Sequence, residues 1–162
     1  MSQRQHRHRP SSRGRSIAAA GLVAALLGAA WWSVARTPAY AGEVTVYKSP
    51  TCVCCERWLD HMRRAGFRVT ERNVAKIAAV KAERGVPDDL ASCHTSIAGR
   101  YVVEGHVPAD LVARLLEKQS PVAGLAVPGM PAGSPGMEGG QRQRYDVLSF
   151  TRAGETAVYA TR

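Results

Sequence analysis

The chain has 162 residues, a length that fits one compact domain with appendages and excludes a large multidomain enzyme. Its formal net charge is +9, from 22 Lys and Arg residues against 13 Asp and Glu residues. The first 42 residues hold six arginines and no acidic residue, so residues 43–162 keep a net charge of only +3. A nucleic-acid-binding protein would carry its basic residues on the folded part, and we therefore expect no nucleic-acid partner.

Residues 1–41 have the pattern of an export signal. An arginine-rich start precedes an uncharged apolar stretch at 17–35, and the small-residue sequence Ala39-Tyr40-Ala41 follows as a cleavage site. The alternative is an uncleaved N-terminal membrane anchor, because the apolar stretch is nearly long enough to cross a bilayer and Trp31-Trp32 suits its interface. Both interpretations predict an exported or periplasmic protein, which meets the membrane only if the segment is retained.

Residues 42–120 predict a core domain of alternating strands and helices. Alternating β-branched residues mark strands, whereas apolar residues three or four positions apart mark helices. The predicted elements are a strand at 43–48, a helix from 49 to 64, a strand at 67–70, a helix capped by Asn73 and ended by Gly85, strands at 91–97 and 100–104, and a helix from Pro108. The first two strands should be parallel, because a helix connects them. The order β-α-β-α-β-β-α predicts an α/β, three-layer, thioredoxin-like sandwich, in which Pro87 takes the place of a cis-proline facing a dithiol.

The rest of the chain divides into a loop at 121–144 and a hairpin at 145–162. Ten of the twenty residues from 121 to 140 are Gly or Pro, a composition that predicts neither helix nor strand. A loop of this length is unusual in a compact domain, so it is either a flexible linker or a functional flap. Strand-like runs at 145–150 and 156–160 predict the closing hairpin.

The four cysteines are the strongest chemical signal of the chain. Cys52, Cys54 and Cys55 lie where the first predicted strand meets the first helix, and Cys93 lies on the third predicted strand. Two structural disulfides are the ordinary expectation for an exported protein. However, a Cys54–Cys55 bond would be strained, and a Cys52–Cys55 bond leaves Cys54 to reach Cys93 or stay free. The helix N-terminus should lower the pKa of its thiols, and thiolates serve both metal binding and disulfide exchange. Because the third strand should lie beside the first, we predict that all four sulfurs share one site.

The types of donor indicate a soft metal ion. Thiolates favour Cu(I) and Zn(II), but adjacent Cys54 and Cys55 cannot easily both bind one tetrahedral Zn(II). Sulfurs that bridge several Cu(I) ions avoid this difficulty, so we predict copper, with a multinuclear cluster as one form, and zinc as the weaker alternative. Met130 and Met137 of the loop add thioether donors suited to Cu(I). The alternative is that these methionines fill gaps against the core or simply belong to a flexible loop.

The histidines are weaker candidates than the sulfurs. His61, on the same helix as the CxCC motif, is a ligand, a residue that tunes the acidity of the thiols, or a half-exposed residue at a helix end. His94 follows Cys93 in a predicted strand, so its side chain should point to the opposite face. His106 precedes the last predicted helix, where it should satisfy backbone groups of the turn.

Seven short segments of the chain together carry a family resemblance. They are Lys48-Ser-Pro-Thr-Cys-x-Cys-Cys, Trp58-x-x-His61, Gly66-Phe67, Gly85-Val-Pro87, Ser92-Cys-His-Thr95, Glu104-Gly-His-Val-Pro108 and the loop from Gly124 to Glu138. In these segments the chain resembles the CopG-like copper-resistance family, long classified as a domain of unknown function, over roughly Val44 to Tyr159. The resemblance implies a thioredoxin-like fold, export, and copper binding through the four cysteines. It indicates a site more firmly than a reaction.

Two functions compete. The first is an exported copper-tolerance protein that holds Cu(I) in a thiolate cluster, for sequestration or for transfer to other periplasmic copper-handling proteins. In one version it also interconverts Cu(I) and Cu(II), which would make it an enzyme. The second is a thiol-disulfide oxidoreductase of thioredoxin type, with Cys52 and Cys55 as its catalytic residues. We expect the first, because the second leaves Cys54, Cys93 and the loop methionines without a role.

Overall fold

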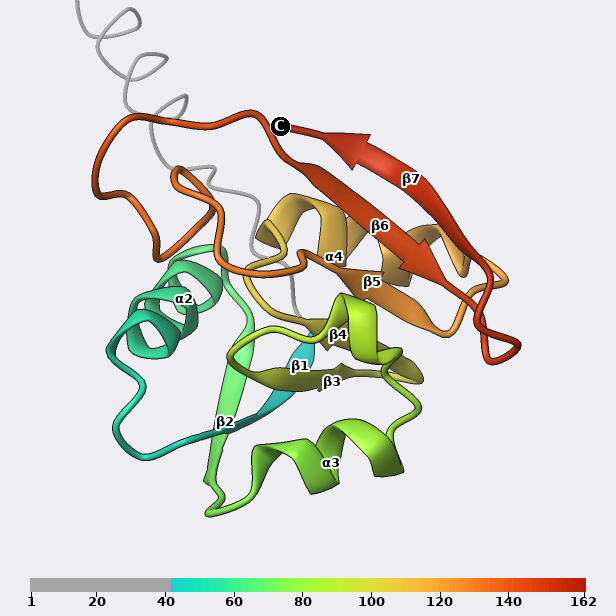
Figure 1. The fold of residues 1–162 in the computed structure, drawn as a ribbon, viewed down its shortest axis with the longest axis horizontal. Coiled ribbons are helices and arrows are strands. Elements are labelled where there is room, and N and C mark those ends of the chain that lie inside the picture. The colour runs from blue at the N-terminus through green and yellow to red at the C-terminus, as the bar shows by residue number, and fades with distance from the viewer. Residues whose placement is uncertain (1–41) are drawn as a thin grey trace, which may run out of the picture. The chain divides into compact units, whose positions relative to one another are not determined.

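The computed structural model describes residues 42–162, and the predicted signal or anchor at 1–41 lies outside the described residues (Figure 1). In chain order the elements are β1 (Glu43–Lys48), α2 (Val53–Arg64), β2 (Arg68–Asn73), α3 (Ile77–Glu83), the 3-10 helix η1 (Asp88–Leu90), β3 (Thr95–Ala98), β4 (Tyr101–Glu104), α4 (Ala109–Lys118), β5 (Gly124–Ala126), β6 (Asp146–Phe150) and β7 (Thr156–Thr161). Within this described part, no helix combines the length and the apolar composition that a membrane crossing requires.

A seven-stranded sheet runs through the domain in the order β2-β1-β3-β4-β5-β6-β7. β1 and β2 are parallel, as predicted from the helix that connects them. β3 lies antiparallel on the other side of β1, with Thr95 opposite Tyr47. The predicted adjacency of β1 and β3 is therefore confirmed. This register brings the segment before β3 to the end of β1 that leads into the cysteines.

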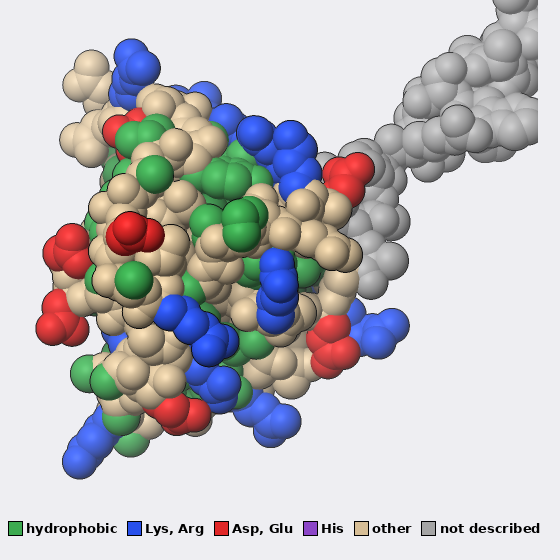
Figure 2. Space-filling view, turned by 90° about the vertical axis from the view of Figure 1, so that its right-hand side faces the viewer, with side chains coloured by type: hydrophobic (Ala, Val, Ile, Leu, Met, Phe, Trp, Pro, Cys, Tyr) green, Lys and Arg blue, Asp and Glu red, His purple; other side chains and the backbone are tan. Residues whose placement is uncertain are grey.

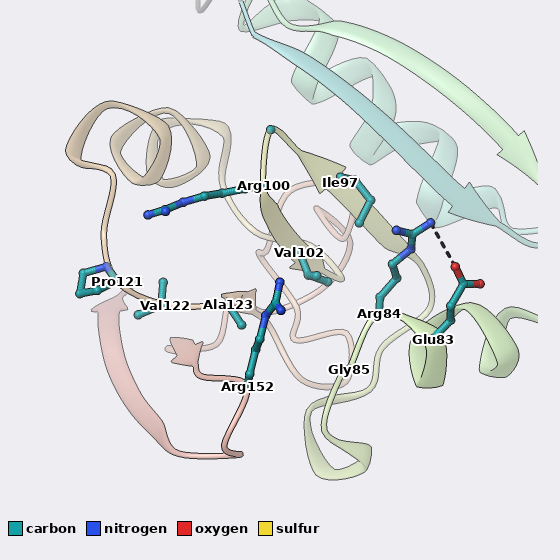
Figure 3. Close-up of a pocket in the computed structure, with 11 residues that line it drawn as sticks. Glu83, Arg84, Gly85, Ile97, Arg100, Val102, Pro121, Val122, Ala123 and Arg152 are labelled. Carbon is teal, nitrogen blue, oxygen red and sulfur yellow. Dashed lines mark ion pairs between the residues drawn. The ribbon is translucent and has the colours of Figure 1, made fainter.

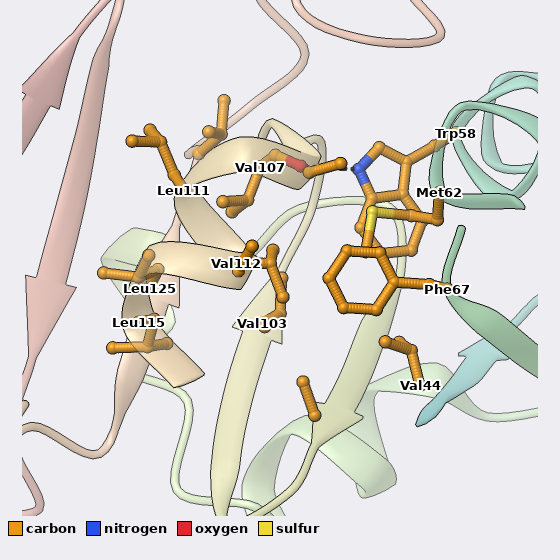
Figure 4. Close-up of a cluster of buried hydrophobic side chains, with 14 of the residues drawn as sticks. Val44, Trp58, Met62, Phe67, Val103, Val107, Leu111, Val112, Leu115 and Leu125 are labelled. Atoms are coloured by element: carbon orange, nitrogen blue, oxygen red, sulfur yellow. Dashed lines mark hydrogen bonds between the residues drawn. The ribbon is translucent and has the colours of Figure 1, made fainter. Parts of the chain in front are cut away.

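Helices cover both faces of the sheet. α2 and α4 pack on one face, where Trp58 of α2 and Leu115 of α4 belong to one buried cluster with Val44 of β1 (Figure 4). Trp58 Nε1 also donates to the Val107 carbonyl at 2.9 Å, which fixes the entry to α4. α3 lies on the other face, where it contacts β1 and β3 (Figure 1). The predicted mixed α/β architecture is confirmed, and its layers are consistent with a thioredoxin-like fold.

The prediction that no strand forms within 121–144 is wrong at the start of that segment. β5 pairs parallel with β4 and antiparallel with β6, so it joins the C-terminal hairpin to the core. A Cβ atom on Gly124 would lie 2.1 Å from the Val102 carbonyl oxygen and 2.7 Å from the Phe150 ring. Glycine is therefore needed for these strands to pack, and its presence does not exclude a strand. The hairpin itself, β6 with β7, is confirmed.

β3 is shorter than the predicted strand at 91–97. It begins at Thr95, and the backbone before it follows the 3-10 helix η1 and an irregular turn. The Ser92 amide donates to the Glu104 carboxylate at 2.6 Å. A side chain thus takes the hydrogen bond that a neighbouring strand would otherwise provide, and the regular strand starts later.

Two further expectations about the α3 side of the domain are wrong. Asn73 is the last residue of β2 and does not cap α3, which begins at Ile77. Pro87 precedes η1 and is separated by it from β3. The described residues contain no cis peptide bond, so Pro87 is not the cis-proline that a thioredoxin-type dithiol would face.

Candidate metal centre

Three of the cysteines lie where β1 leads into α2. Cys52 is the N-cap of α2, and Cys54 and Cys55 are in its first turn. Cys52 and Cys55 form a disulfide, whereas Cys54 is a free thiol. Lys48, almost fully buried at the end of β1, pairs with Glu56 of α2 at 2.5 Å. This ion pair ties the cysteine turn to the sheet.

Cys93 joins these cysteines from the segment before β3. Its Sγ lies 3.6 Å from Cys55 Sγ and 3.9 Å from Cys54 Sγ. Cys54 Sγ in turn lies 3.5 Å from Cys52 Sγ, and all four sulfurs lie within 4.8 Å of one another. The structure therefore brings together the four cysteines that were predicted to share one site. Of the disulfide arrangements considered, it has the Cys52–Cys55 bond with Cys54 and Cys93 free.

The loop after β5 folds over the cysteines as a flap, defined here as residues 128–138. Ser92 donates its hydroxyl to the Gly129 carbonyl, and the Pro135 carbonyl accepts a hydrogen bond from His106. Gly136 has a φ of +88°, and a Cβ there would lie 2.8 Å from the Cys54 carbonyl oxygen. The flap backbone thus touches α2 at the cysteines, which supports a flap over a free linker.

The two flap methionines differ in where they lie. Met130 Sδ lies 3.8 Å from Cys54 Sγ, and its side chain remains 49% exposed, so it bridges the cysteine cluster and solvent. Met137 closes a turn of the flap, because its amide donates to the Ser134 carbonyl and its carbonyl accepts from the Gly133 amide. Within the described residues no sulfur contact is found for Met137, and its role as a ligand stays a prediction.

Two histidines that the sequence made weak candidates contact Cys93 directly. His94 Nδ1 lies 3.2 Å and His106 Nε2 lies 3.0 Å from Cys93 Sγ, and both rings are fully buried. The expectation that His94 points away from Cys93 is wrong, because regular strand alternation begins only at Thr95. His106 does bond backbone, as expected, but only through one ring nitrogen. Cys93, His94 and His106 thus form a second group able to hold a metal ion.

The Pro135 carbonyl sets the tautomer of His106. A carbonyl only accepts hydrogen bonds, so His106 Nδ1 carries the proton that spans the 2.7 Å to Pro135. Burial lowers the pKa of His106, and the ring is therefore neutral at neutral pH, with an unprotonated Nε2 facing Cys93. Burial also lowers the pKa of His94 well below its usual value, and His94 Nε2 has no hydrogen-bond partner among the described residues. Neutral imidazoles with a free nitrogen are suitable metal ligands.

The Cys93 thiol holds its proton strongly. Burial raises its pKa to about 12, and the neighbouring Cys54 contributes to the rise. At neutral pH Cys93 is therefore a neutral S–H group placed to donate to His106 Nε2. This differs from the lowered pKa expected for thiols at the N-terminus of α2, because Cys93 lies on another segment. A metal ion that binds Cys93 as a thiolate must displace this proton.

A buried carboxylate holds the Cys93 segment in place. Glu104, fully buried on β4, accepts from the Ser92 amide at 2.6 Å and from the Thr95 hydroxyl at 2.7 Å. Lys81 of α3 forms an ion pair with the same carboxylate. Glu104 thus fixes the residues on both sides of Cys93 and His94.

Comparison with known proteins identifies the family. A family model described as a protein of unknown function, DUF411, matches residues 90–137, and a comparison with curated proteins finds no match. Two solved structures, named copper resistance protein CopG Form 2 and Form 1, match with TM-scores of 0.72 and 0.70. Form 2 is 41% identical over 75% of this chain and 98% of its own length, and Form 1 is 42% identical over 74% and 96%. The chain belongs to the CopG family.

The CopG-family resemblance seen in the sequence is thereby confirmed. The matched residues 90–137 carry Cys93, the two buried histidines and the flap up to Met137. This is the half of the site that is distant in sequence from the CxCC motif. The sequence contained a signal for the histidines, because both lie in segments that carried the resemblance. Their burial and their contact with Cys93 required the structure.

Among the described residues, two groups of side chains could hold a metal ion, and His61 belongs to neither of them. Its Nε2 accepts a hydrogen bond from the Ala109 amide at 3.0 Å, so it caps the start of α4.

We expect His61→Ala to lower the free energy of unfolding by about 1 kcal/mol, the typical cost of a lost cap, and to leave the metal content unchanged. Urea denaturation and metal analysis of the same samples check both effects. Loss of metal without loss of stability would instead assign His61 to the metal centre.

Proposed function

We propose that this CopG-family protein binds copper in a copper-tolerance system and holds Cu(I) in a cluster of thiolates. Two homologous structures are named as copper resistance proteins, which supports a copper-related role. The observation that carries the proposal is the approach of Cys93 Sγ to within 3.6 Å of Cys55 and 3.9 Å of Cys54. Four sulfurs from two segments that are distant in sequence are therefore close enough to bind the same metal ions.

The donor set favours Cu(I) over Zn(II). Cys54 and Cys55 are adjacent in one helical turn and cannot easily both bind one tetrahedral ion, whereas each sulfur can bridge two Cu(I) ions. Met130 adds a thioether 3.8 Å from Cys54, and thioethers prefer soft ions. His94 and His106 extend the set with imidazole nitrogens beside Cys93. Imidazole also binds Cu(II), so both copper oxidation states have donors in this site.

The disulfide suggests how copper and thiol chemistry are coupled. When the Cys52–Cys55 bond is reduced, all four sulfurs become available as ligands. Formation of this bond from the two thiols releases two protons and two electrons, which convert two Cu(II) ions to two Cu(I) ions. The reverse reaction opens the disulfide as two Cu(I) ions are oxidised. In this version of the function the protein interconverts the two copper states.

A thioredoxin-type thiol-disulfide oxidoreductase is the alternative function. The Cys52–Cys55 pair meets its minimal requirement, but Pro87 lacks the cis peptide bond that would face the dithiol. That function also gives no role to the contacts of Cys93 with Cys54 and the histidines. Insulin reduction in metal-free buffer that survives replacement of both Cys54 and Cys93 by serine would favour the alternative.

We propose that this chemistry occurs outside the cytoplasm, in the periplasm of a two-membrane bacterium, because residues 1–41 have the pattern of an export leader. Periplasmic copper-handling proteins would be its partners for transfer. The half-exposed Met130 is suited to receive or release copper at the surface of the cluster.

Cu(I) titration of the reduced protein under anaerobic conditions tests the central proposal. We expect more than one Cu(I) per chain, measured by competition with a chromogenic Cu(I) chelator and by native mass spectrometry. Because the pKa of Cys93 is about 12, its proton leaves as copper binds. Binding should therefore tighten by about tenfold per pH unit for each proton released, and weaken as the pH falls. An affinity that is constant from pH 6 to 8, or zinc binding as tight as copper binding, would contradict the proposal.

Addition of Cu(II) to the reduced protein without oxygen tests the redox version. We expect two Cu(II) ions to be reduced for each disulfide that forms, because the thiol–disulfide couple transfers two electrons. Electron paramagnetic resonance follows the loss of Cu(II), and mass spectrometry after alkylation counts the remaining thiols. Cu(II) that stays unreduced over minutes would exclude this version while leaving Cu(I) binding intact.

A further inference from the structure

A cavity lies on the face of the sheet opposite α2 and α4. Its volume is about 880 Å³, within the usual range of small-molecule sites, and its lining comes from the end of α3, the β3–β4 turn, the segment before β5 and the β6–β7 turn. Ala98, beside this turn, pairs with Val44 at the start of β1, whereas the cysteines follow the other end of β1. The cavity and the proposed copper site therefore lie on opposite faces of the sheet and at opposite ends of β1.

The floor of this cavity is aliphatic. Ile97 and Val102 project from β3 and β4, and Val122 and Ala123 line it before β5 (Figure 3). Ile97, Val122 and Ala123 are only partly buried, so hydrophobic surface remains open to solvent. α3 contacts β1 and β3, and its last residue, Glu83, stops at the rim.

Arginines surround this floor. Arg84, Arg100 and Arg152 come from three separate segments, and Glu83 is the one acidic residue in the lining, which therefore has a net charge of +2 (three minus one). In Figure 3 the Arg152 side chain extends between those of Arg84 and Arg100. The space-filling view of this side of the molecule likewise shows Lys and Arg side chains next to hydrophobic ones (Figure 2).

The three guanidinium groups differ in how far they are already satisfied. Arg100 is held by one terminal nitrogen, which donates to the Tyr101 hydroxyl at 2.9 Å and to the carbonyls of Gln119 and Ser120 at 3.1 and 3.2 Å. Its guanidinium carbon also lies 4.9 Å from the centre of the Tyr101 ring, and its other nitrogens make no hydrogen bond to the described residues. Arg84 makes a long 3.4 Å contact with Glu83, and its guanidinium carbon lies 5.8 Å from the centre of the Tyr47 ring. For Arg152, no ion pair or hydrogen bond is found in the described part of the chain. The cavity thus offers one prepositioned and two weakly engaged cations.

We propose that this cavity binds a small organic anion, a carboxylate or phosphate group carried on an aliphatic body. The anionic group would accept paired hydrogen bonds from the arginines, because a guanidinium donates two parallel N–H groups to either oxyanion. The aliphatic body would cover Ile97 and its neighbours on the floor. A ligand that has only the anionic group or only the aliphatic body contacts half of the site. Tight binding therefore requires both.

Titrations with octanoate, octyl phosphate, octanol and acetate, followed by ¹⁵N-edited NMR of the protein, test this inference. We expect saturable shifts at Gly99, Ala123 and Arg152 with octanoate or octyl phosphate, and the tighter of the two identifies the head group. Octanol and acetate should each bind at least about tenfold more weakly. If octanol bound as tightly as octanoate, the arginines would contribute nothing to binding. If acetate bound as tightly as octanoate, the aliphatic floor would contribute nothing. Either result overturns the proposal.

Three variants localise the binding. Arg152→Ala should weaken octanoate or octyl phosphate by about tenfold or more, whereas Arg144→Ala, an exposed arginine outside the cavity, should change nothing. Glu83→Gln should strengthen binding, because it removes the acidic residue that competes for Arg84. Equal weakening by Arg152→Ala and Arg144→Ala would overturn the proposal. Copper content, measured in parallel, should be unchanged in all three variants, so failure here is distinguishable from failure of the proposed copper function.

Discussion

The double variant Cys54→Ser/Cys93→Ser is expected to lose more than half of the Cu(I) that the reduced wild-type protein binds. Cys93 is the only cysteine supplied by the second segment, and its Sγ lies within 3.9 Å of both Cys54 and Cys55. A serine hydroxyl is a hard donor that stays protonated at neutral pH, and it does not replace a thiolate for a soft ion. Metal analysis of anaerobically purified protein measures the effect.

Val53→Ser provides the matched control for this variant. It introduces the same serine between Cys52 and Cys54, at a position that is 65% exposed, but removes no sulfur. We expect the copper content of this control to remain close to wild type. The far-ultraviolet circular dichroism of both variants should also match wild type, because none of the three substituted residues belongs to the main hydrophobic cluster. A double variant that keeps most of its copper would refute a cluster built on Cys93.

The cysteine cluster could be predicted because it depends on sheet topology. A helix between β1 and β2 makes them parallel, and a third strand beside β1 brings its leading segment to the CxCC turn. The register with Thr95 opposite Tyr47 places Cys93 two residues before that pair. Pairing of strands follows from the hydrophobic pattern, so the approach of two distant segments followed from the sequence.

The histidines could not be placed in the same way. The direction of His94 was inferred from strand alternation, which holds only where the backbone joins the ladder of a sheet. Glu104 captures the Ser92 amide, and the chain around Cys93 is therefore irregular. His106 faces Cys93 because Gly105, with a φ of +68°, turns the chain directly after β4. Such side-chain capture and local turns leave no periodic signal in a sequence.

Glu104, at the end of β4, connects the sheet and α3 to the segment that carries Cys93. Glu104 is completely buried, and its partner Lys81 has a side chain only 11% exposed. The same carboxylate binds the Ser92 amide and the Thr95 hydroxyl. Replacing it therefore removes an ion pair and two hydrogen bonds that flank Cys93. Stability and metal binding should respond together at this position.

Glu104→Ala is expected to lower the free energy of unfolding by about 3–5 kcal/mol, because it leaves the buried Lys81 cation without its partner. Urea denaturation of the metal-free protein measures this loss. Glu104→Gln keeps an oxygen acceptor for Ser92 or Thr95, so it should fold with a smaller loss and report the copper affinity if the alanine variant does not fold. Asp60→Ala, which breaks the exposed 2.9 Å pair with Arg63, is the control and should cost no more than about 1 kcal/mol. Equal losses in Glu104→Ala and Asp60→Ala would show that the buried carboxylate does not hold the Cys93 segment, and the copper site would then need another source of rigidity.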